Sequence, residues 1–394
     1  MDLPVETLPG TDHLALPVRD RAGVVARGDH DLHPAFDSLV SVVTARLQCR
    51  CEASQFQDDL RRGHGACLFL RPADDAALRR RVAKRVAVIG FGAVGRETAR
   101  LLAGRGDEVR VVQRRAPAAL PRGARAQAAD VEDAASIRRA CEGVEEVALC
   151  LGLPYDSAVW ERAWPVAMSN VLEGCSHSGA RLVFADNLYM YGPQDRPLTE
   201  DMPLTDYGRK PRLRAAVTRL WMRAHGEGRV RAAAVRAADF YGPDVPTSVL
   251  AAFGVARLVA GKPAISPYPP DQPHDFTYVP DFARALVSLI DGPDDAFGRA
   301  WHVPNAPTHT LRELIAMAAQ RIGVRPRLTV LPRLLAEVAG LFNTQLAEIG
   351  EMRFQWDRPY RVDSSSFSAR FWSDATPFEQ GLAATIAFYS AARP

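Results

Sequence analysis

From Arg85 onward, short apolar runs alternate with amphipathic stretches along the chain. Each run has the length of a buried strand, and apolar residues recur at helical spacing in the stretch that follows it. We expect strands at Val86–Ile89, Val109–Val112, Arg125–Ala128, Val147–Leu151, Leu182–Ala185 and Val230–Val235. We expect helices after Gly95 and at Ala134–Cys141, Trp160–Cys175 and Leu213–His225. This alternation predicts an α/β fold with a doubly wound parallel sheet, covered by helices on both faces.

The pattern is different on either side of this region. Residues 1–83 are interrupted by prolines and rich in His, Asp and Arg, which indicates an N-terminal extension of uncertain order. Residues 84–243 contain the predicted sheet. In residues 244–394 we expect helices joined by proline-rich loops, at Val249–Ala260, Asp281–Ile290, Leu311–Ile322 and Pro377–Ala392. We interpret this last part mostly as a smaller substrate lobe over the carboxyl edge of the sheet, with elements that return to the core.

Composition and charge exclude several classes of protein. The 394 residues include 49 Lys and Arg and 46 Asp and Glu, and the net charge of +3 is too balanced to predict a nucleic-acid partner. No apolar run approaches the ~18 residues of a membrane span. The first twenty residues carry several acidic side chains and no secretory signal. With six cysteines, the chain is predicted to be cytoplasmic, with no membrane partner.

The first predicted strand ends in a glycine pattern, Gly90, Gly92 and Gly95, that has a mechanical interpretation. Gly90 allows a tight turn, Gly92 lets a pyrophosphate approach the backbone, and Gly95 lets helix and strand pack closely. Ala93 and Val94 begin the helix, whose free N–H groups and dipole favour phosphate. A second strand follows about twenty residues on. We therefore expect a dinucleotide site here.

The residues after the neighbouring strands predict which dinucleotide binds. A carboxylate at the end of the second strand would bind the ribose 2′-OH of NAD, but this chain has Arg114 and Arg115 there, which suit the 2′-phosphate of NADP. We expect NADP(H) to be preferred over NAD(H); the alternative is two solvated arginines. Asp130 and Val131 would flank the adenine, unless Asp130 is a plain helix N-cap. Leu151, at the end of the fourth strand, completes the expected cofactor contacts.

Several further segments occur in an order that resembles a known family. They are Arg181-Leu-Val-Phe-Ala-Asp-Asn-Leu-Tyr-Met-Tyr-Gly192, Arg236-Ala-Ala-Asp-Phe-Tyr-Gly-Pro243, His274-Asp-Phe-Thr-Tyr-Val-Pro-Asp281 and Thr310-Leu-Arg-Glu313. With the glycine loop, they make the chain from residue 85 onward resemble the extended and atypical short-chain dehydrogenase/reductases, in the NAD-dependent epimerase/dehydratase branch. The resemblance implies a Rossmann fold, an enzyme and a possible homodimer. The glycines are spaced one residue closer than is usual in the extended branch.

The catalytic group departs from the family. There, a serine positions a carbonyl, a tyrosine exchanges the proton, and a lysine four residues later lowers the pKa of that tyrosine. The matching positions here carry Asn187, Lys210 and Arg214, and the chain contains no Tyr-x-x-x-Lys. Asn187 can still donate a hydrogen bond. Arg214 can hold ribose or phosphate but cannot donate a proton near neutral pH. Lys210, if desolvated beside the nicotinamide, can act as the acid or contact the cofactor.

Phenols are the alternative proton donors. Tyr189 and Tyr191 lie on the same side as Asn187 if the segment stays extended. We place Lys210 and Tyr191 ahead of Tyr207 and Tyr241, and for each a structural role remains an alternative. Expected substrate contacts are Tyr189, Tyr241, His274 and Tyr278. Aromatic residues that either line a pocket or belong to the core are Tyr155, Trp160, Trp164, Tyr268, Phe276 and Tyr278.

The N-terminal extension contains candidate metal ligands, in His30-x-x-His33, Cys49-x-Cys51 and His64-x-x-Cys67. Their spacing matches no common zinc module, so we predict no metal. The expected function is an NADPH-dependent oxidoreductase that reduces a carbonyl or conjugated C=C or C=N group of a non-sugar, aromatic or bulky small molecule. The alternatives are a sugar-nucleotide-type epimerase or dehydratase, and a non-catalytic NADP(H)-binding sensor protein.

Overall fold

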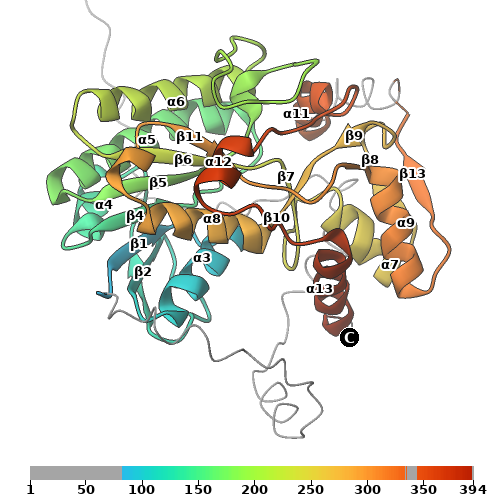
Figure 1. The fold of residues 1–394 in the computed structure, drawn as a ribbon, viewed down its shortest axis with the longest axis horizontal. Helices are drawn as coiled ribbons and strands as arrows, with labels where there is room; N and C mark the ends of the chain where they lie inside the picture. Colours follow the sequence, from blue (N-terminus) through green and yellow to red (C-terminus); the bar gives the residue numbers. More distant parts are fainter. Residues whose placement is uncertain (1–81, 333, 335–343, 393–394) are drawn as a thin grey trace, which may run out of the picture. The chain divides into compact units, whose positions relative to one another are not determined.

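Seven parallel strands form the central sheet of the part of the chain that the structure describes (Figure 1). The computed structural model describes residues 82–332, 334 and 344–392, all of them in the unit Arg50–Pro394. The strand order is β11-β6-β5-β4-β1-β2-β3, and every neighbouring pair is parallel. The strands are β1 Arg85–Ile89, β2 Glu108–Gln113, β3 Ala124–Ala128, β4 Glu146–Leu149, β5 Arg181–Asp186, β6 Ala232–Arg236 and β11 Ala300–His302. The doubly wound parallel sheet is confirmed, and its order reverses at β1, between β2 and β4.

Helices cover both faces of the sheet, as the alternating pattern predicts. One apolar cluster joins α3, α8 and α12 to the sheet, and another joins α4, α5 and α6 to the opposite face. The bounds of these helices are α3 Ala93–Gly104, α4 Ala134–Cys141, α5 Ser157–Ser178, α6 Lys210–Gly226, α8 Val279–Asp291 and α12 Ser365–Arg370. Because α8, β11 and α12 come from the C-terminal part of the chain, that part contributes to the core as well as to the lobe.

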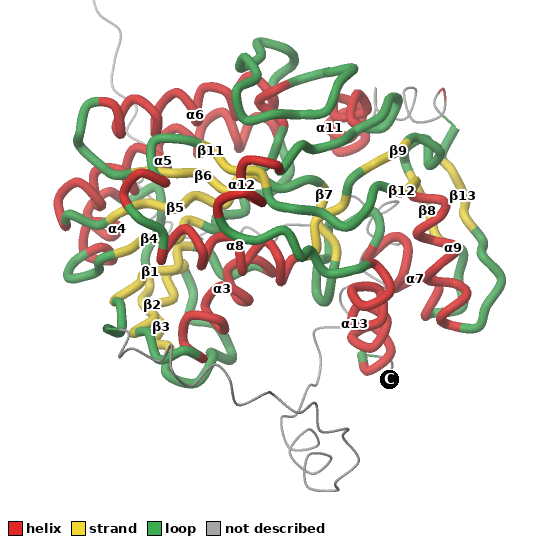
Figure 2. The backbone as a smooth tube through the Cα atoms, viewed as in Figure 1, coloured by secondary structure: helices red, strands yellow, loops and turns green. Residues whose placement is uncertain are grey.

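The smaller lobe consists of short elements that loops connect (Figure 2). Its helices are the π-helical turn Ala251–Val255, α7 Ala256–Val259, α9 Leu311–Ile322, α11 Thr344–Glu351 and α13 Phe378–Ala391. Its paired strands are β7 Asp239–Tyr241 with β10 Phe276–Tyr278, β9 Pro273–His274 with β12 His309–Thr310, and β8 Ala264–Ser266 with β13 Leu328–Val330. The sequence did not predict these strands, because two or three residues are too few to establish a period.

The described residues also contain short 3₁₀ turns, but neither a membrane-spanning helix nor a cluster of metal ligands. Three-residue and four-residue 3₁₀ turns occur at Tyr189–Tyr191, Asp294–Ala296 and Met352–Gln355. In the described part of the chain, no helix combines the length and the hydrophobicity needed to span a bilayer. The same residues contain no cluster of three or more His, Cys, Asp and Glu side chains that could hold a metal ion. The His and Cys pairs between His30 and Cys67 lie outside the described residues.

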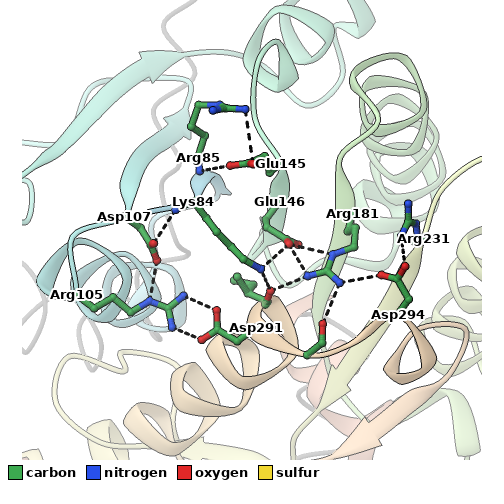
Figure 3. A network of polar contacts seen from close by, with 12 residues as sticks. Lys84, Arg85, Arg105, Asp107, Glu145, Glu146, Arg181, Arg231, Asp291 and Asp294 are labelled. Atoms are coloured by element: carbon green, nitrogen blue, oxygen red, sulfur yellow. Dashed lines mark hydrogen bonds and ion pairs between the residues drawn. The ribbon is translucent and has the colours of Figure 1, made fainter. Parts of the chain in front are cut away.

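Charged side chains are paired at the amino edge of the sheet, where the strands begin (Figure 3). Lys84 Nζ donates to Glu146 Oε1 over 3.0 Å, and Arg181 Nε donates to the same oxygen over 3.0 Å. Both cations also donate to the carbonyl of Ile290 near the C-terminus of α8, where a positive charge is favourable. Since Glu146 is only 3% exposed, this network ties β1, β4, β5 and α8 together in the interior.

Candidate functional site

The glycine loop has the geometry that its spacing predicts. Gly90 has a φ of +94°, and a Cβ there would lie 2.6 Å from the carbonyl oxygen of Cys150. A Cβ on Gly95 would lie 2.0 Å from the carbonyl oxygen of Gly90, so only glycine lets α3 pack this closely on β1. Space is open beside Gly92, where a Cβ would have no neighbour within 4 Å among the described atoms. The backbone at Gly92 is therefore open to a phosphate.

The start of α3 is suited to an anion. Gly92 is its N-cap and has no side chain to cap the first turn, which also contains no acidic residue. Ala93 and Val94 contribute the first backbone N–H groups of the helix, which point out from its positive end. The open loop and the uncapped helix together fit the pyrophosphate of a dinucleotide.

Arg114 and Arg115 follow the last residue of β2 and are exposed. Neither forms an ion pair with any residue that the structure describes. Most other arginines near the sheet do, for example Arg105 with Asp291 at 2.5 Å. The two guanidinium groups therefore remain available to a phosphate.

Asp130 is not the N-cap of α4. That role belongs to Asp133, whose side chain accepts from the backbone N–H groups of Ala135 and Ser136. The carboxylate of Asp130 instead accepts from the backbone N–H of Glu132 over 3.0 Å, and the carbonyl of Val131 accepts from Asn170. Asp130, Val131 and the half-buried Leu151 follow β3 and β4 at the carboxyl edge, on the side of the sheet that the glycine loop occupies.

Asn187 comes directly after β5 and shapes the loop that follows. Its Oδ1 accepts from the backbone N–H of Tyr189 over 3.1 Å, so the Nδ2 group is the part of this amide left to act as a donor. The resulting turn runs into the 3₁₀ turn Tyr189–Tyr191, and Gly192 ends it with a φ of +64°. The segment is not extended, and the expectation that Tyr189 and Tyr191 share a side is wrong for that reason.

Tyr191 is completely buried and lies in a polar network inside the fold. Its Oη accepts from Arg236 over 2.5 Å and lies 2.9 Å from Nε2 of His302. His302 Nδ1 must donate to the carbonyl of Asp363, 3.0 Å away, so Nε2 accepts the proton of the phenol. Burial lowers the pKa of His302 to about 3 and raises that of Tyr191. Both polar functions of Tyr191 are thus used internally.

Arg214 belongs to the same interior. Its guanidinium pairs with Asp186 and lies 4.2 Å from the ring centre of Trp164. Arg236 Nε donates to the same carboxylate over 3.3 Å, so two buried arginines share Asp186. The Nε of Arg214 is buried without a hydrogen-bond partner among the described residues. A donor without a partner can hydrogen-bond to a ribose hydroxyl, which is a contact expected of Arg214 from the sequence.

Lys210 begins α6 and is completely buried in a different cluster. Its Nζ forms ion pairs with Glu348 and, at 3.5 Å, with Glu351. It also donates to Ser157 Oγ over 3.1 Å, and it lies 4.5 Å from the ring centre of Tyr155. Burial lowers the pKa of Lys210 to about 8, and the charge of Glu351 opposes this shift. Lys210 and Arg214 therefore do not form one group: each has its own carboxylate partners.

His274 is positioned by Asp239 and by the ring of Trp356. His274 Nε2 is 2.8 Å from Asp239 Oδ2, and the imidazole ring stacks on Trp356 with the ring centres 3.9 Å apart. The negative charge of Asp239 contributes, after burial, to raising the pKa of Tyr189. The buried Nδ1 of His274 has no hydrogen-bond partner among the described residues.

Tyr241 and Tyr278 lie together, with ring centres 5.3 Å apart. Tyr241 also packs on Phe378 of α13, and it is 1% exposed. Within the described part of the chain, no hydrogen bond, ion pair or ring contact joins either tyrosine to Asn187, Tyr189 or Lys210. Tyr207 is exposed and lies against Phe354. Tyr241 and Tyr278 therefore belong to an aromatic patch with Phe378, whereas Tyr189 stacks on Trp160 and Lys210 lies against Tyr155.

Several residues of this region were missed by sequence reasoning. Ser157, Glu348 and Glu351 lie in contact with Lys210 but belong to no motif, and Asp239, which contacts His274, lies in a segment of the family resemblance without being singled out. Tyr155 was considered only as an aromatic residue near the cleft. The aromatic residues Trp160, Trp164, Tyr268 and Phe276 are at most 7% exposed and belong to the core.

The family model described as the NAD dependent epimerase/dehydratase family matches residues 86–303. The chain belongs to this family. The resemblance stated from the sequence is confirmed, and the protein is an NAD(P)-dependent enzyme of the short-chain dehydrogenase/reductase type. A search of curated proteins finds no match.

Solved structures with the same fold include three sugar-nucleotide enzymes. UDP-glucose 4-epimerase of Thermus thermophilus, in complex with NAD, is 21% identical with a TM-score of 0.63, over 77% of this chain and 98% of the other. UDP-glucuronic acid 4-epimerase of Bacillus cereus, with UDP-glucuronic acid and NAD, is 15% identical with a TM-score of 0.65, over 78% and 99%. DesIV of Streptomyces venezuelae, a dTDP-glucose 4,6-dehydratase with NAD bound, is 19% identical with a TM-score of 0.64, over 77% and 96%. At these identities the likeness establishes the fold.

Proposed function

We propose that the protein is an NADP(H)-dependent oxidoreductase that reduces a carbonyl or conjugated C=C or C=N group of a small, non-sugar molecule. The observation that carries this proposal is the pair Arg114 and Arg115, exposed and without ion pairs among the described residues, at the strand end where a 2′-phosphate would lie. Two free guanidinium groups there favour a phosphate over the 2′-hydroxyl of NAD.

The rest of the site is assigned by its chemistry. Gly90, Gly92, Ala93, Val94 and Gly95 would hold the pyrophosphate. The residues expected to contact the adenine and the remainder of the cofactor are Asp130, Val131, Leu151 and Arg214. When bound, NADPH supplies the hydride. Asn187 would orient the acceptor through its Nδ2 group, and the positive charge of Lys210 would support proton transfer. The buried Tyr191 would stabilise the loop rather than exchange protons.

The experiment that tests the cofactor preference is a binding titration of NADPH and NADH. The double variant Arg114→Ala/Arg115→Ala should lose about 10-fold to 100-fold in NADPH affinity, because it loses charge-assisted hydrogen bonds, and should keep its NADH affinity. Arg325→Ala is the matched control, since Arg325 is exposed in the lobe without an ion pair in the described chain. Equal NADPH affinity in the double variant and the control would refute the preference.

A second candidate is a sugar-nucleotide-type epimerase or dehydratase. The family match and the activities of the three structural neighbours favour it. In such a reaction the cofactor is reduced and reoxidised within one turnover, so substrate is converted without net consumption of NADPH. A reductase consumes one NADPH for each product molecule, and a sensor binds NADPH with no acceptor at all. Measuring the ratio of NADP⁺ to product therefore separates the three functions.

A further inference from the structure

A tyrosine and a lysine meet at the carboxyl edge of the sheet, although the family's Tyr-x-x-x-Lys is absent from the sequence. Tyr155 comes from the loop between β4 and α5, and Lys210 begins α6. The Nζ of Lys210 lies 4.5 Å from the centre of the Tyr155 ring. The two residue types are thus brought together in space from separate elements.

We propose that Tyr155 is the proton donor of the reduction and that Lys210 is a positioning residue, which holds a positive charge against the Tyr155 ring. This inference rests on the proposed function and names a residue that the family motif does not provide. It assigns to Lys210 an indirect role, in place of the direct acid role that the sequence favours.

The location of Tyr155 supports this assignment. Its ring packs edge-on against Trp160, which in turn stacks on Tyr189, two residues after the Asn187 that would orient the acceptor. Tyr155 is 37% exposed, whereas Tyr191, Tyr268 and Tyr360 are at most 7% exposed. Tyr207 is more exposed, at 44%, but it lies against Phe354. Tyr155 thus combines packing near the Asn187 loop with access to a substrate.

The location of Lys210 excludes it as the group that touches the substrate. Glu348, Glu351 and Ser157 Oγ surround its Nζ, and the side chain is 0% exposed. Glu351 also accepts from the backbone N–H of Lys210 over 3.0 Å, which fixes the start of α6. A cation held on the face of an aromatic ring stabilises the electron-rich phenolate, so it makes proton release from Tyr155 easier.

The protonation state of Tyr155 suits a donor. Although part of Tyr155 is exposed, desolvation by the surrounding protein, and then its tyrosine neighbours, raise the pKa of Tyr155 above the usual value, so the phenol is protonated at neutral pH. In the reduction, the C4–H bond of the nicotinamide breaks and its hydride forms a new C–H bond with the carbonyl carbon. NADPH is thereby oxidised to NADP⁺. The π electron pair of the C=O bond moves to oxygen, which takes the proton from Tyr155 Oη. The phenolate is then reprotonated from water, to which the exposed side chain has access.

Kinetics test the donor role. Tyr155→Phe should lower kcat by about 10²-fold to 10⁴-fold, with the NADPH dissociation constant unchanged within twofold. Lys210→Met should lower kcat by less and move the pH dependence of kcat to higher pH, which a purely structural role would not do. Tyr389→Phe, which removes a hydroxyl in α13, is the matched control and should leave kcat unchanged. If Tyr155→Phe retains wild-type kcat, the assignment is wrong while the proposed function stands.

A second readout does not depend on turnover. With 3-fluorotyrosine at position 155, the ¹⁹F resonance should shift when NADP⁺ is added, and its titration midpoint should rise when Lys210 is replaced by methionine. A midpoint that does not respond to Lys210→Met would overturn the positioning role even if Tyr155→Phe is poorly folded. If wild-type protein reduces no acceptor, the proposed function fails, and the donor assignment fails with it.

Discussion

Two lysine–glutamate ion pairs lie at opposite edges of the same sheet, one partly buried and one fully buried at its lysine. At the amino edge, Lys84 and Arg181 together surround Glu146 and also bind carbonyl groups of the α8 terminus. At the carboxyl edge, Lys210 is surrounded by Glu348 and Glu351 from α11. The first arrangement joins core elements to one another. The second joins the core to the lobe, beside an exposed phenol.

The difference shows why burial of a charged residue alone does not indicate function. Near the amino edge, the charged groups are paired within the network of Figure 3, although Oε2 of Glu146 is buried without a hydrogen-bond partner among the described residues. Near the carboxyl edge, Nε of Arg214 and Nδ1 of His274 also lack partners in the described chain. An unpaired buried group therefore does not by itself indicate a site, and what distinguishes the carboxyl edge is that ligands of open α/β sheets bind there. We therefore expect substitutions at the two edges to have different consequences.

The largest effect is expected at the amino edge. Glu146→Ala leaves Lys84 and Arg181 without their shared carboxylate in a buried position, and should cost about 3–5 kcal/mol of unfolding free energy. The NADPH affinity of the remaining folded protein should be unchanged. Denaturant unfolding and a binding titration measure the two quantities. Loss of NADPH affinity without loss of stability would mean that the two edges are not functionally distinct.

The second largest effect on the unfolding free energy is expected for Lys210→Met, and the size of this effect depends on pH. The folded-state pKa of Lys210, about 8, lies below the usual 10.5, so between these values the unfolded state binds more protons than the folded state. Stability should therefore rise with pH in this window, by up to about 3 kcal/mol relative to Lys210→Met. Unfolding curves of the wild-type protein and of Lys210→Met, recorded across this pH range, would show the rise in stability. A constant difference between the two proteins across the window would contradict the shifted pKa.

Two substitutions in the glycine loop distinguish an effect on stability from an effect on NADPH binding. Gly95→Ala introduces a Cβ 2.0 Å from a carbonyl oxygen and should cost about 1–3 kcal/mol of stability together with NADPH affinity. Gly92→Ala places its Cβ in open space, so it should lower NADPH affinity and leave the melting temperature unchanged. Calorimetry measures the melting temperature of each variant, and fluorescence titration measures its NADPH affinity. Unchanged NADPH binding in Gly92→Ala would place the pyrophosphate elsewhere.

The smallest effect is expected at the exposed margin of the amino edge. Asp294 pairs with Arg181 at 3.2 Å and with Arg231, and its side chain is 62% exposed. Asp294→Asn should change the unfolding free energy by less than about 1 kcal/mol, because solvent and salt screen exposed pairs. Comparing the stability losses of Asp294→Asn and Glu146→Ala in the same unfolding assay tests whether the exposed pair contributes less than the buried carboxylate. Equal losses in both variants would show that burial does not control the network.

The sequence predicted those parts of the protein that depend on local patterns. The bounds of α4 and α9 match the predicted ranges, and the roles of Gly90 and Gly95 follow from spacing alone. The direction in which the Tyr191 side chain points depends instead on a turn after β5, which the side chain of Asn187 stabilises by accepting from the backbone N–H of Tyr189. A strand-like apolar segment gave no sign of that turn.

The partners of Lys210 were beyond local prediction. Glu348 and Glu351 reach it from α11, more than a hundred residues later in the chain, and Tyr155 reaches it from the loop after β4. The sequence predicts no helix at α11, and a local pattern could not show what its glutamates contact. The contact on which the proposed proton-transfer site rests is therefore visible only when the elements are placed in space.

The most direct test of this account is a titration of the wild-type protein with NADPH and with NADH, followed by nicotinamide fluorescence. The free Arg114 and Arg115 predict that NADPH binds at least about tenfold more tightly. Equal or tighter binding of NADH would contradict the proposed preference and favour the epimerase or dehydratase function.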